Sequence, residues 1–119
     1  RPQEAERDYT EALAIRRRLA ERSPEQFEPF LAVTLKSLAV LYSRTNRIDD
    51  LEDVLVEYVK VLYCLNKRAQ TAYSEEFSAM LRTLQGYYTQ FRRLSPEEAD
   101  SKIKDLLRHA DPKCRGGGL

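Results

Sequence analysis

Residues 5–53 read AERDYTEALAIRRRLAERSPEQFEPFLAVTLKSLAVLYSRTNRIDDLED, and this stretch decides the fold. Its apolar side chains recur at spacings of three and four, as they do on one face of an α-helix. The first run consists of Ala5, Tyr9, Ala12, Ile15 and Leu19. The second run consists of Leu31, Leu35, Leu38 and Tyr42. The stretch therefore predicts two consecutive helices that are separated near Ser23 and Pro24.

The same periodicity continues through the rest of the chain and predicts an all-α protein of about five helices. We expect helices at residues 2–21, from 27–30 to 44, at 49–65, at 71–92 and at 96–110. Ser95, which precedes a proline and stands three residues before Glu98, forms a capping box for the last helix. Asp111-Pro112 should end that helix and leave residues 111–119 as a flexible tail.

The apolar pattern also repeats along the chain with a fixed offset. A shift of 46 residues superposes the first two runs on the third and fourth helices, and a shift of 48 carries the third helix onto the fifth. Under the first shift Tyr9 falls on Leu55, and Leu38 falls on Leu84. Helical periodicity alone does not keep one offset through two helices and the loop between them. A repeat of this length predicts stacked pairs of helices.

The repeated residues resemble the tetratricopeptide repeat, in the lengthened form of kinesin-light-chain-like repeats. The positions that match the pattern are Leu35, Leu38, Ala39 and Tyr42 in the first helix of a pair, and Ala5, Tyr9 and Ala12 in the second helix. The resemblance is close over residues 4–53 and looser over residues 54–110. It implies a right-handed array of antiparallel helix pairs, an α-solenoid, over residues 1–110. A closed four-helix bundle is the structural alternative.

The resemblance implies a function in holding another protein, because the first helix of each pair lines the groove of such an array. The implied groove stripes are Val33, Lys36, Val40, Ser43 and Arg44, then Ala79, Arg82, Gly86, Thr89 and Gln90. Of these we expect a partner to contact Val33, Lys36, Val40, Arg44, Arg82 and Gln90. Lys36 and Arg82 are equivalent under the 46-residue shift, which favours a partner protein or peptide with acidic residues. The alternative is that these cations are solvated or paired locally.

Two further features bear on that function. Relatives that clamp an extended peptide carry an asparagine where this chain has Ser37 and Thr83, whose side chains lack the paired donor and acceptor of an amide. The looser second repeat, with Tyr58 and Gln85 where small residues are expected, favours an alternative function. In that alternative the chain is a terminal or spacer segment of a longer array and has no ligand of its own.

The first helix resembles the second member of a pair and has no partner helix before it. We therefore expect Tyr9 and Ile15 to be partly uncovered, and exposed apolar surface of this kind recruits neighbours. The chain is expected to form a homo-oligomer or to be part of a longer array. The basic run at residues 16–18 points in three directions on a helix, so it predicts a solvated face and not a nucleic-acid site.

The composition argues against several other classes of protein. Twenty basic and 19 acidic residues give a net charge of +1, which provides no field to recruit nucleic acid or a membrane. Cys64 and Cys114 form no recognisable disulfide framework or zinc site, so we expect reduced thiols and a cytoplasmic setting. His109 has no catalytic partner nearby in sequence. We expect no enzyme activity, no cofactor and no metal site.

Overall fold

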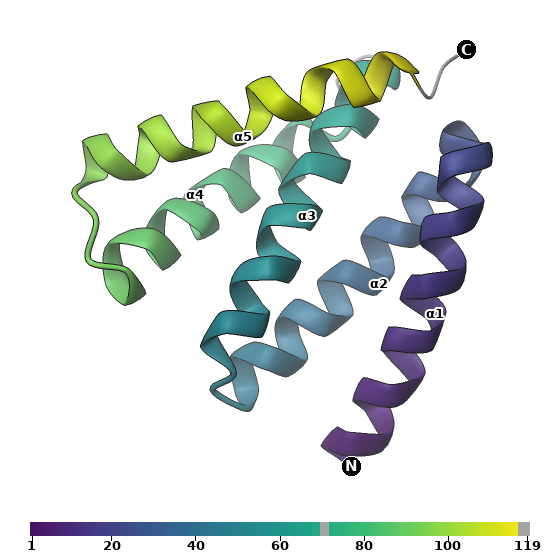
Figure 1. Ribbon diagram of the computed structural model, residues 1–119, viewed down its shortest axis with the longest axis horizontal. Coiled ribbons are helices and arrows are strands. Elements are labelled where there is room, and N and C mark those ends of the chain that lie inside the picture. Colours follow the sequence, from purple (N-terminus) through teal and green to yellow (C-terminus); the bar gives the residue numbers. More distant parts are fainter. Residues whose placement is uncertain (70–71, 117–119) are drawn as a thin grey trace.

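The computed structural model describes residues 1–69 and 72–116, and these residues form five α-helices and no β-strand (Figure 1). The helices are α1 (Pro2–Arg22), α2 (Pro24–Arg44), α3 (Ile48–Arg68), α4 (Ser74–Phe91) and α5 (Pro96–Gly116). The predicted all-α class with about five helices is confirmed. The predicted start of the fourth helix at residue 71 and the last three residues of the predicted tail lie outside the described residues.

The helix bounds repeat with the offsets that the sequence predicts. The bounds of α3 are those of α1 moved by 46 residues, and the bounds of α5 are those of α3 moved by 48. Some side chains at superposed positions of α2 and α4 share their burial, since Leu38 and Leu84 are 1% and 0% exposed and Tyr42 and Tyr88 are both buried. The repeat in sequence is therefore also a repeat of helix length for α1, α3 and α5, and of burial at these positions of α2 and α4.

The turns that follow α2 and α4 are built alike. Asn46 and Arg93 have φ angles of 56° and 57°, in the left-handed region. In each turn the N–H of the next residue donates to the carbonyl of the equivalent tyrosine, Tyr42 at 3.0 Å and Tyr88 at 3.1 Å. A single left-handed residue turns the chain back so that it satisfies carbonyls at the end of a helix. Helix α4 nevertheless ends at Phe91, one position beyond Gln90, the repeat equivalent of Arg44.

Helix α2 begins earlier than the sequence predicts. It starts at Pro24, and only Ser23 separates it from α1. A proline is compatible with the first turn, where its missing N–H has no partner within the helix. Pro29 lies inside the helix, where one hydrogen bond, to the carbonyl of Glu25, is lost.

Helix α5 ends later than the sequence predicts. It continues through Pro112 to Gly116, so the prediction that Asp111-Pro112 ends it is wrong. Pro112 removes one hydrogen bond within the helix. The turn beyond it is held from outside, by contacts of Asp111 and Cys114 with α3. Most of the predicted tail is therefore helix.

The five helices form two layers. Figure 1 shows α1, α3 and α5 in the nearer layer and α2 and α4 in the farther one. Helix α2 packs between α1 and α3, and α4 and α5 pack against α3 and against each other. The molecule measures 39 × 37 × 21 Å, and its shortest dimension matches two helix diameters of about 10 Å each. The most deeply buried large side chains lie on α2, α3 and α4: Leu35, Leu38, Tyr58, Leu62, Leu84 and Tyr88.

The start of α5 has the predicted capping box. The Glu98 backbone N–H donates to Ser95 Oγ at 3.1 Å, and the Ser95 N–H donates to the Glu98 carboxylate at 2.9 Å. These hydrogen bonds lower the pKa of Glu98, because they favour its charged form. The box therefore fixes where the chain leaves the loop after α4 and enters α5.

Candidate functional site

A groove lies between α2 and α4 with α3 at its base, and we call it the α2–α4 groove. It has a volume of about 460 Å³, within the range of sites that take a small ligand or a few side chains. Its base is formed by Leu51, Leu55 and Tyr58, which are 9%, 2% and 1% exposed. No Cα atom of α2 lies within 8 Å of one in α4, so the two helices stand apart and leave this space open.

The walls of the α2–α4 groove combine small, apolar and basic side chains. The α2 wall consists of Lys36, Ala39, Val40, Ser43 and Arg44, and the α4 wall consists of Met80, Thr83, Gly86, Tyr87, Gln90 and Phe91. Val40 and Phe91 are 44% and 41% exposed, although they are large and apolar. A Cβ atom added to Gly86 would meet nothing within 4 Å, so this glycine widens the groove. Apolar surface that stays in water beside a hollow indicates a place for a partner.

All formal charge in the lining of the groove is positive. Lys36 and Arg44 line it and no Asp or Glu does. Neither cation forms an ion pair within residues 1–69 and 72–116. Several other cations are paired across helices, as Arg17 of α1 is with Glu57 of α3. The groove therefore offers two uncompensated cations beside an apolar base.

Two tyrosine hydroxyls fix the geometry of the groove. Tyr58 of α3 donates to the Glu76 carboxylate of α4. Tyr87 of α4 donates to the Ile48 carbonyl at 2.8 Å and lies 3.2 Å from the Glu52 carboxylate. Burial is the main cause that raises the pKa of both phenols, that of Tyr87 to about 12, so both are neutral donors near pH 7. These cross-links hold the base of the groove against its α4 wall.

Four of the six residues predicted to contact a partner line the groove: Lys36, Val40, Arg44 and Gln90. The other two do not line it, although both are exposed on α2 and α4, with Val33 at 59%. Arg82 makes no ion pair within the described part of the chain. The equivalence of Lys36 and Arg82 in the repeat therefore does not bring both cations to one hollow.

Ser37 and Thr83 stand at the positions where peptide-clamping tetratricopeptide repeats, which the sequence resembles, carry asparagine. Ser37 Oγ donates to the Val33 carbonyl at 3.1 Å, and Thr83 Oγ1 donates to the Ala79 carbonyl at 3.0 Å. Each hydroxyl donates its single proton to a carbonyl of its own helix. Neither is a free donor toward the backbone of a bound peptide.

Sequence reasoning missed the apolar base and much of the α4 wall. The periodicity places Leu51, Leu55 and Tyr58 in the core, and nothing in it sets how far α2 stands from α4. Met80, Tyr87 and Phe91 are spaced by seven and four residues, so they share one face of α4. That spacing is the signal that could have found the wall.

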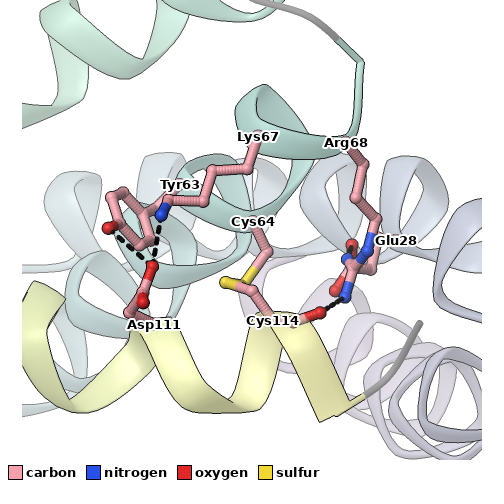
Figure 2. The surroundings of a disulfide bond; sticks show 7 residues. All are labelled: Glu28, Tyr63, Cys64, Lys67, Arg68, Asp111 and Cys114. Atoms are coloured by element: carbon pink, nitrogen blue, oxygen red, sulfur yellow. Dashed lines mark hydrogen bonds and ion pairs between the residues drawn. A yellow bond between two sulfur atoms is a disulfide. The ribbon is translucent and has the colours of Figure 1, made fainter. Parts of the chain in front are cut away.

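A disulfide bond joins Cys64 of α3 to Cys114 of α5 (Figure 2). The two Cα atoms are 5.1 Å apart, although 50 positions separate the residues in sequence. The expectation of two reduced thiols is therefore wrong. Helix α5 crosses over α3 and continues past Pro112, which brings Cys114 onto Cys64 and out of the predicted tail.

An arginine extends the link from the disulfide to a third helix. Arg68 of α3 donates to the Cys114 carbonyl and pairs with the Glu28 carboxylate of α2 (Figure 2). Burial raises the pKa of Glu28, and the hydrogen bond from Arg68 opposes that shift. Arg68 thus ties the last turns of α5 to both α3 and α2.

On the other side of the disulfide, a carboxylate of α5 meets two donors of α3. Tyr63 donates to Asp111 at 3.0 Å, and Lys67 pairs with the same carboxylate (Figure 2). The hydrogen bond from Lys67 to Asp111 is the main cause that raises the pKa of Lys67. These contacts account for the continuation of α5 past Pro112.

Residues 1–69 and 72–116 contain no group of three or more His, Cys, Asp or Glu side chains that could hold a metal ion. His109 is exposed, and its Nδ1 lies 2.8 Å from the Asp105 carbonyl one turn earlier in α5. This contact places His109 against its own helix and not against a nucleophile.

Three comparisons with known proteins place the chain in no family. No protein-family model, no curated protein and no solved structure matches it. In the described part of the chain, no helix combines the length and the apolar character that crossing a bilayer requires.

Proposed function

We propose that the chain is a protein-binding module of tetratricopeptide-like helix pairs, and that its α2–α4 groove holds an acidic, amphipathic helix of a partner protein. The observation that carries the proposal is the pair of uncompensated cations, Lys36 and Arg44, beside an apolar base without a carboxylate. Such a surface is complementary to apolar anchor side chains flanked by acids.

The spacing of the groove residues indicates the partner's pattern. Lys36, Val40 and Arg44 are four residues apart, so they form one stripe on α2 in which the cations lie about 12 Å apart. A partner helix laid along this stripe would meet it with acids about two turns apart and an apolar residue between them. Its apolar side chains would pack on Leu51 and Leu55.

A helical partner fits better than an extended one. Ser37 and Thr83 use their hydroxyl protons within their own helices. An extended peptide needs donors and acceptors for its unpaired backbone, whereas a helix satisfies its own backbone. The proposal assigns recognition to side chains and no chemical step to the chain.

A second candidate function has its own observation. Ile15 of α1 is 52% exposed, whereas its repeat equivalent Val61 of α3 is 9% exposed. If the chain is a segment of a longer right-handed array, the same repeat position is expected to be covered in α3 and uncovered in α1. In that case the groove continues beyond α1 and the chain acts as a spacer.

The disulfide bears on where the module works. A cytoplasmic setting requires reduced Cys64 and Cys114, because disulfides seldom persist in the cytosol. The bond between them favours an oxidising setting. We therefore propose that the chain binds its partner in an oxidising compartment, in which the disulfide is stable.

The test is a selection of displayed helical peptides on the 119-residue chain. We expect enrichment of peptides that carry acids at positions i and i+8 with an apolar residue at i+4, or acids at i and i+7 with an apolar residue at i+3. Their affinity should fall with added salt and drop at least about tenfold for Lys36→Glu/Arg44→Glu, because like charges then oppose the partner's acids. Arg7→Glu/Lys104→Glu is the matched control, since both residues are exposed and unpaired outside the groove.

The single substitution Arg82→Glu tests whether Arg82 contributes to binding. If Arg82→Glu weakens the binding of the selected peptides as much as Lys36→Glu does, the binding surface extends beyond the groove lining. Equal retention of the peptides by the wild type and Lys36→Glu/Arg44→Glu contradicts the proposal. Selection of basic peptides contradicts it as well.

A further inference from the structure

Helix α1 has an exposed stripe that none of the described helices covers. Among the described helices α1 packs only against α2, and it reaches α3 through the Arg17–Glu57 ion pair. Away from α2, a seam with spacings of four and three residues runs along α1, and we call it the α1 seam. It consists of Asp8, Ala12, Ile15, Leu19 and Arg22, with Glu11 and Arg18 beside it.

The repeat shows that this is a face that another helix normally covers. Ile15 and Leu19 of the α1 seam superpose on Val61 and Leu65 of α3, which are 9% and 4% exposed. In α1 the same positions are open, with Ile15 at 52% and Leu19 half-buried. Phe30 of α2, beneath the Arg16 guanidinium, adds an exposed aromatic ring next to α1.

The charges of the α1 seam are segregated along the helix. The acids Asp8 and Glu11 precede Ile15, and the arginines Arg18 and Arg22 follow it. All four are exposed, and none forms an ion pair among the described residues. A helix that is acidic in one half and basic in the other is complementary to itself when turned end for end.

We propose that the α1 seam binds the α1 seam of a second copy of the chain, with the two helices antiparallel. Spacings of four and three with apolar residues at the centre form the seam of a two-helix coiled coil. Antiparallel alignment places Glu11 beside Arg18 of the second copy and Asp8 beside Arg22 of the second copy. The two-fold axis repeats both pairs, as an isologous interface requires.

The interface is small, and this sets its strength. One helix pair buries less surface than the ~1,200 Å² of a standard stable complex, so the dimer belongs to the weak, transient class. Its charge pairs are solvent-exposed and therefore sensitive to salt. The α2–α4 groove lies between other helices and stays open in this dimer.

Sedimentation of the 119-residue chain over a range of concentrations tests the proposal. The average mass should rise from 13.9 kDa toward twice that value, and less steeply in high salt. Glu11→Arg and Arg18→Glu should each weaken association at least about tenfold, because each places like charges together twice. A mixture of the two variants should associate as the wild type does, since opposite charges face each other again in the mixed dimer.

Two further variants complete the design. Ile15→Lys places a charge at the centre of the contact and should abolish association while the circular dichroism of the helices is unchanged. Glu97→Arg and Lys104→Glu on α5 have the same spacing and charge changes on another exposed face, and they should leave association intact.

Three results overturn the proposal. A wild-type chain that stays monomeric at millimolar concentration leaves the α1 seam to an occupant other than a second copy. Association that Ile15→Lys does not change lies on another surface. Failure of the mixed variants to associate rules out the antiparallel arrangement.

Discussion

Tyr87 and Tyr88 are neighbours on α4, and their hydroxyls meet opposite environments. Tyr87 donates to the Ile48 carbonyl, whereas the Tyr88 hydroxyl is buried without a hydrogen-bond partner among the described protein atoms. The two rings pack edge to face with centroids 5.7 Å apart. A buried hydroxyl without a partner loses its hydration and gains nothing in return. The pair therefore offers a matched comparison within one turn of helix.

We expect Tyr88→Phe to leave the free energy of unfolding unchanged or to raise it by up to about 1 kcal/mol, because it removes an unsatisfied hydroxyl. Tyr87→Phe should lower it by about 1 kcal/mol, because the Ile48 carbonyl loses its donor. Urea denaturation of both variants measures the difference. The environments described for the two hydroxyls are wrong if Tyr88→Phe is the more destabilising change.

The tyrosines also predict a loss of stability at alkaline pH. Burial raises the pKa of Tyr87 and Tyr88 to about 12 from the usual 10.0, and it raises the pKa of Tyr42 and Tyr58 as well. The folded chain thus favours neutral phenols. This contribution to stability is complete below pH 10 and is lost as the pH rises toward 12.

Phenolate absorbance, recorded alongside urea midpoints between pH 9 and pH 12, tests this dependence. The phenolates of Tyr87 and Tyr88, assigned by difference from the phenylalanine variants, should appear about two pH units above the usual value. The expected sign is a urea midpoint that falls over this interval. Formation of both phenolates at the usual pKa in the folded chain contradicts the account of their burial.

At the scale of single elements, periodicity predicted the helices better than it predicted their ends. The five helices follow from apolar spacing, and the capping box at Ser95 follows from the identity of two residues. The end of α5 did not follow, because Pro112 is a local signal that contacts from α3 override. The disulfide was missed for the same reason, since it depends on Cys114 being helical and lying over Cys64.

The disulfide should stabilise the folded chain chiefly through α5. Opening a loop of 50 residues by Cys64→Ser/Cys114→Ser should lower the free energy of unfolding by about 2–4 kcal/mol, because the unfolded chain gains entropy. A thiol reductant should lower the urea midpoint of the wild type and leave the midpoint of Cys64→Ser/Cys114→Ser unchanged. Hydrogen exchange should speed up in the last turns of α5 more than in α1. Identical midpoints of oxidised and reduced wild type contradict the role given to this bond.

At the scale of the whole molecule, the repeat is the feature that the sequence predicted most completely. The offsets of 46 and 48 residues recur in the bounds of α1, α3 and α5, and the carbonyls of the equivalent tyrosines Tyr42 and Tyr88 accept hydrogen bonds from the turns after α2 and α4. The candidate site was predicted in part. Lys36, Val40 and Arg44 were predicted from the resemblance to tetratricopeptide repeats, whereas the base at Leu55 depends on the distance between two helices that do not touch.

The two proposed binding surfaces lie on different helices of the molecule. The α2–α4 groove is basic and apolar, and the α1 seam is self-complementary in charge. A ligand of the groove therefore meets different helices from those that pair two copies. This separation lets one experiment report on both surfaces.

Methyl NMR of the 119-residue chain, titrated with an acidic helical peptide from the display selection, tests the central claim most directly. The methyl signals of Val40, Leu51, Leu55 and Met80 in the groove should shift with peptide concentration. The methyl signals of Ile103 on α5 should stay in place, because Ile103 does not line the groove. Shifts confined to Ile15 and Leu19 of α1, with an unchanged groove, would contradict the claim that the groove binds the partner.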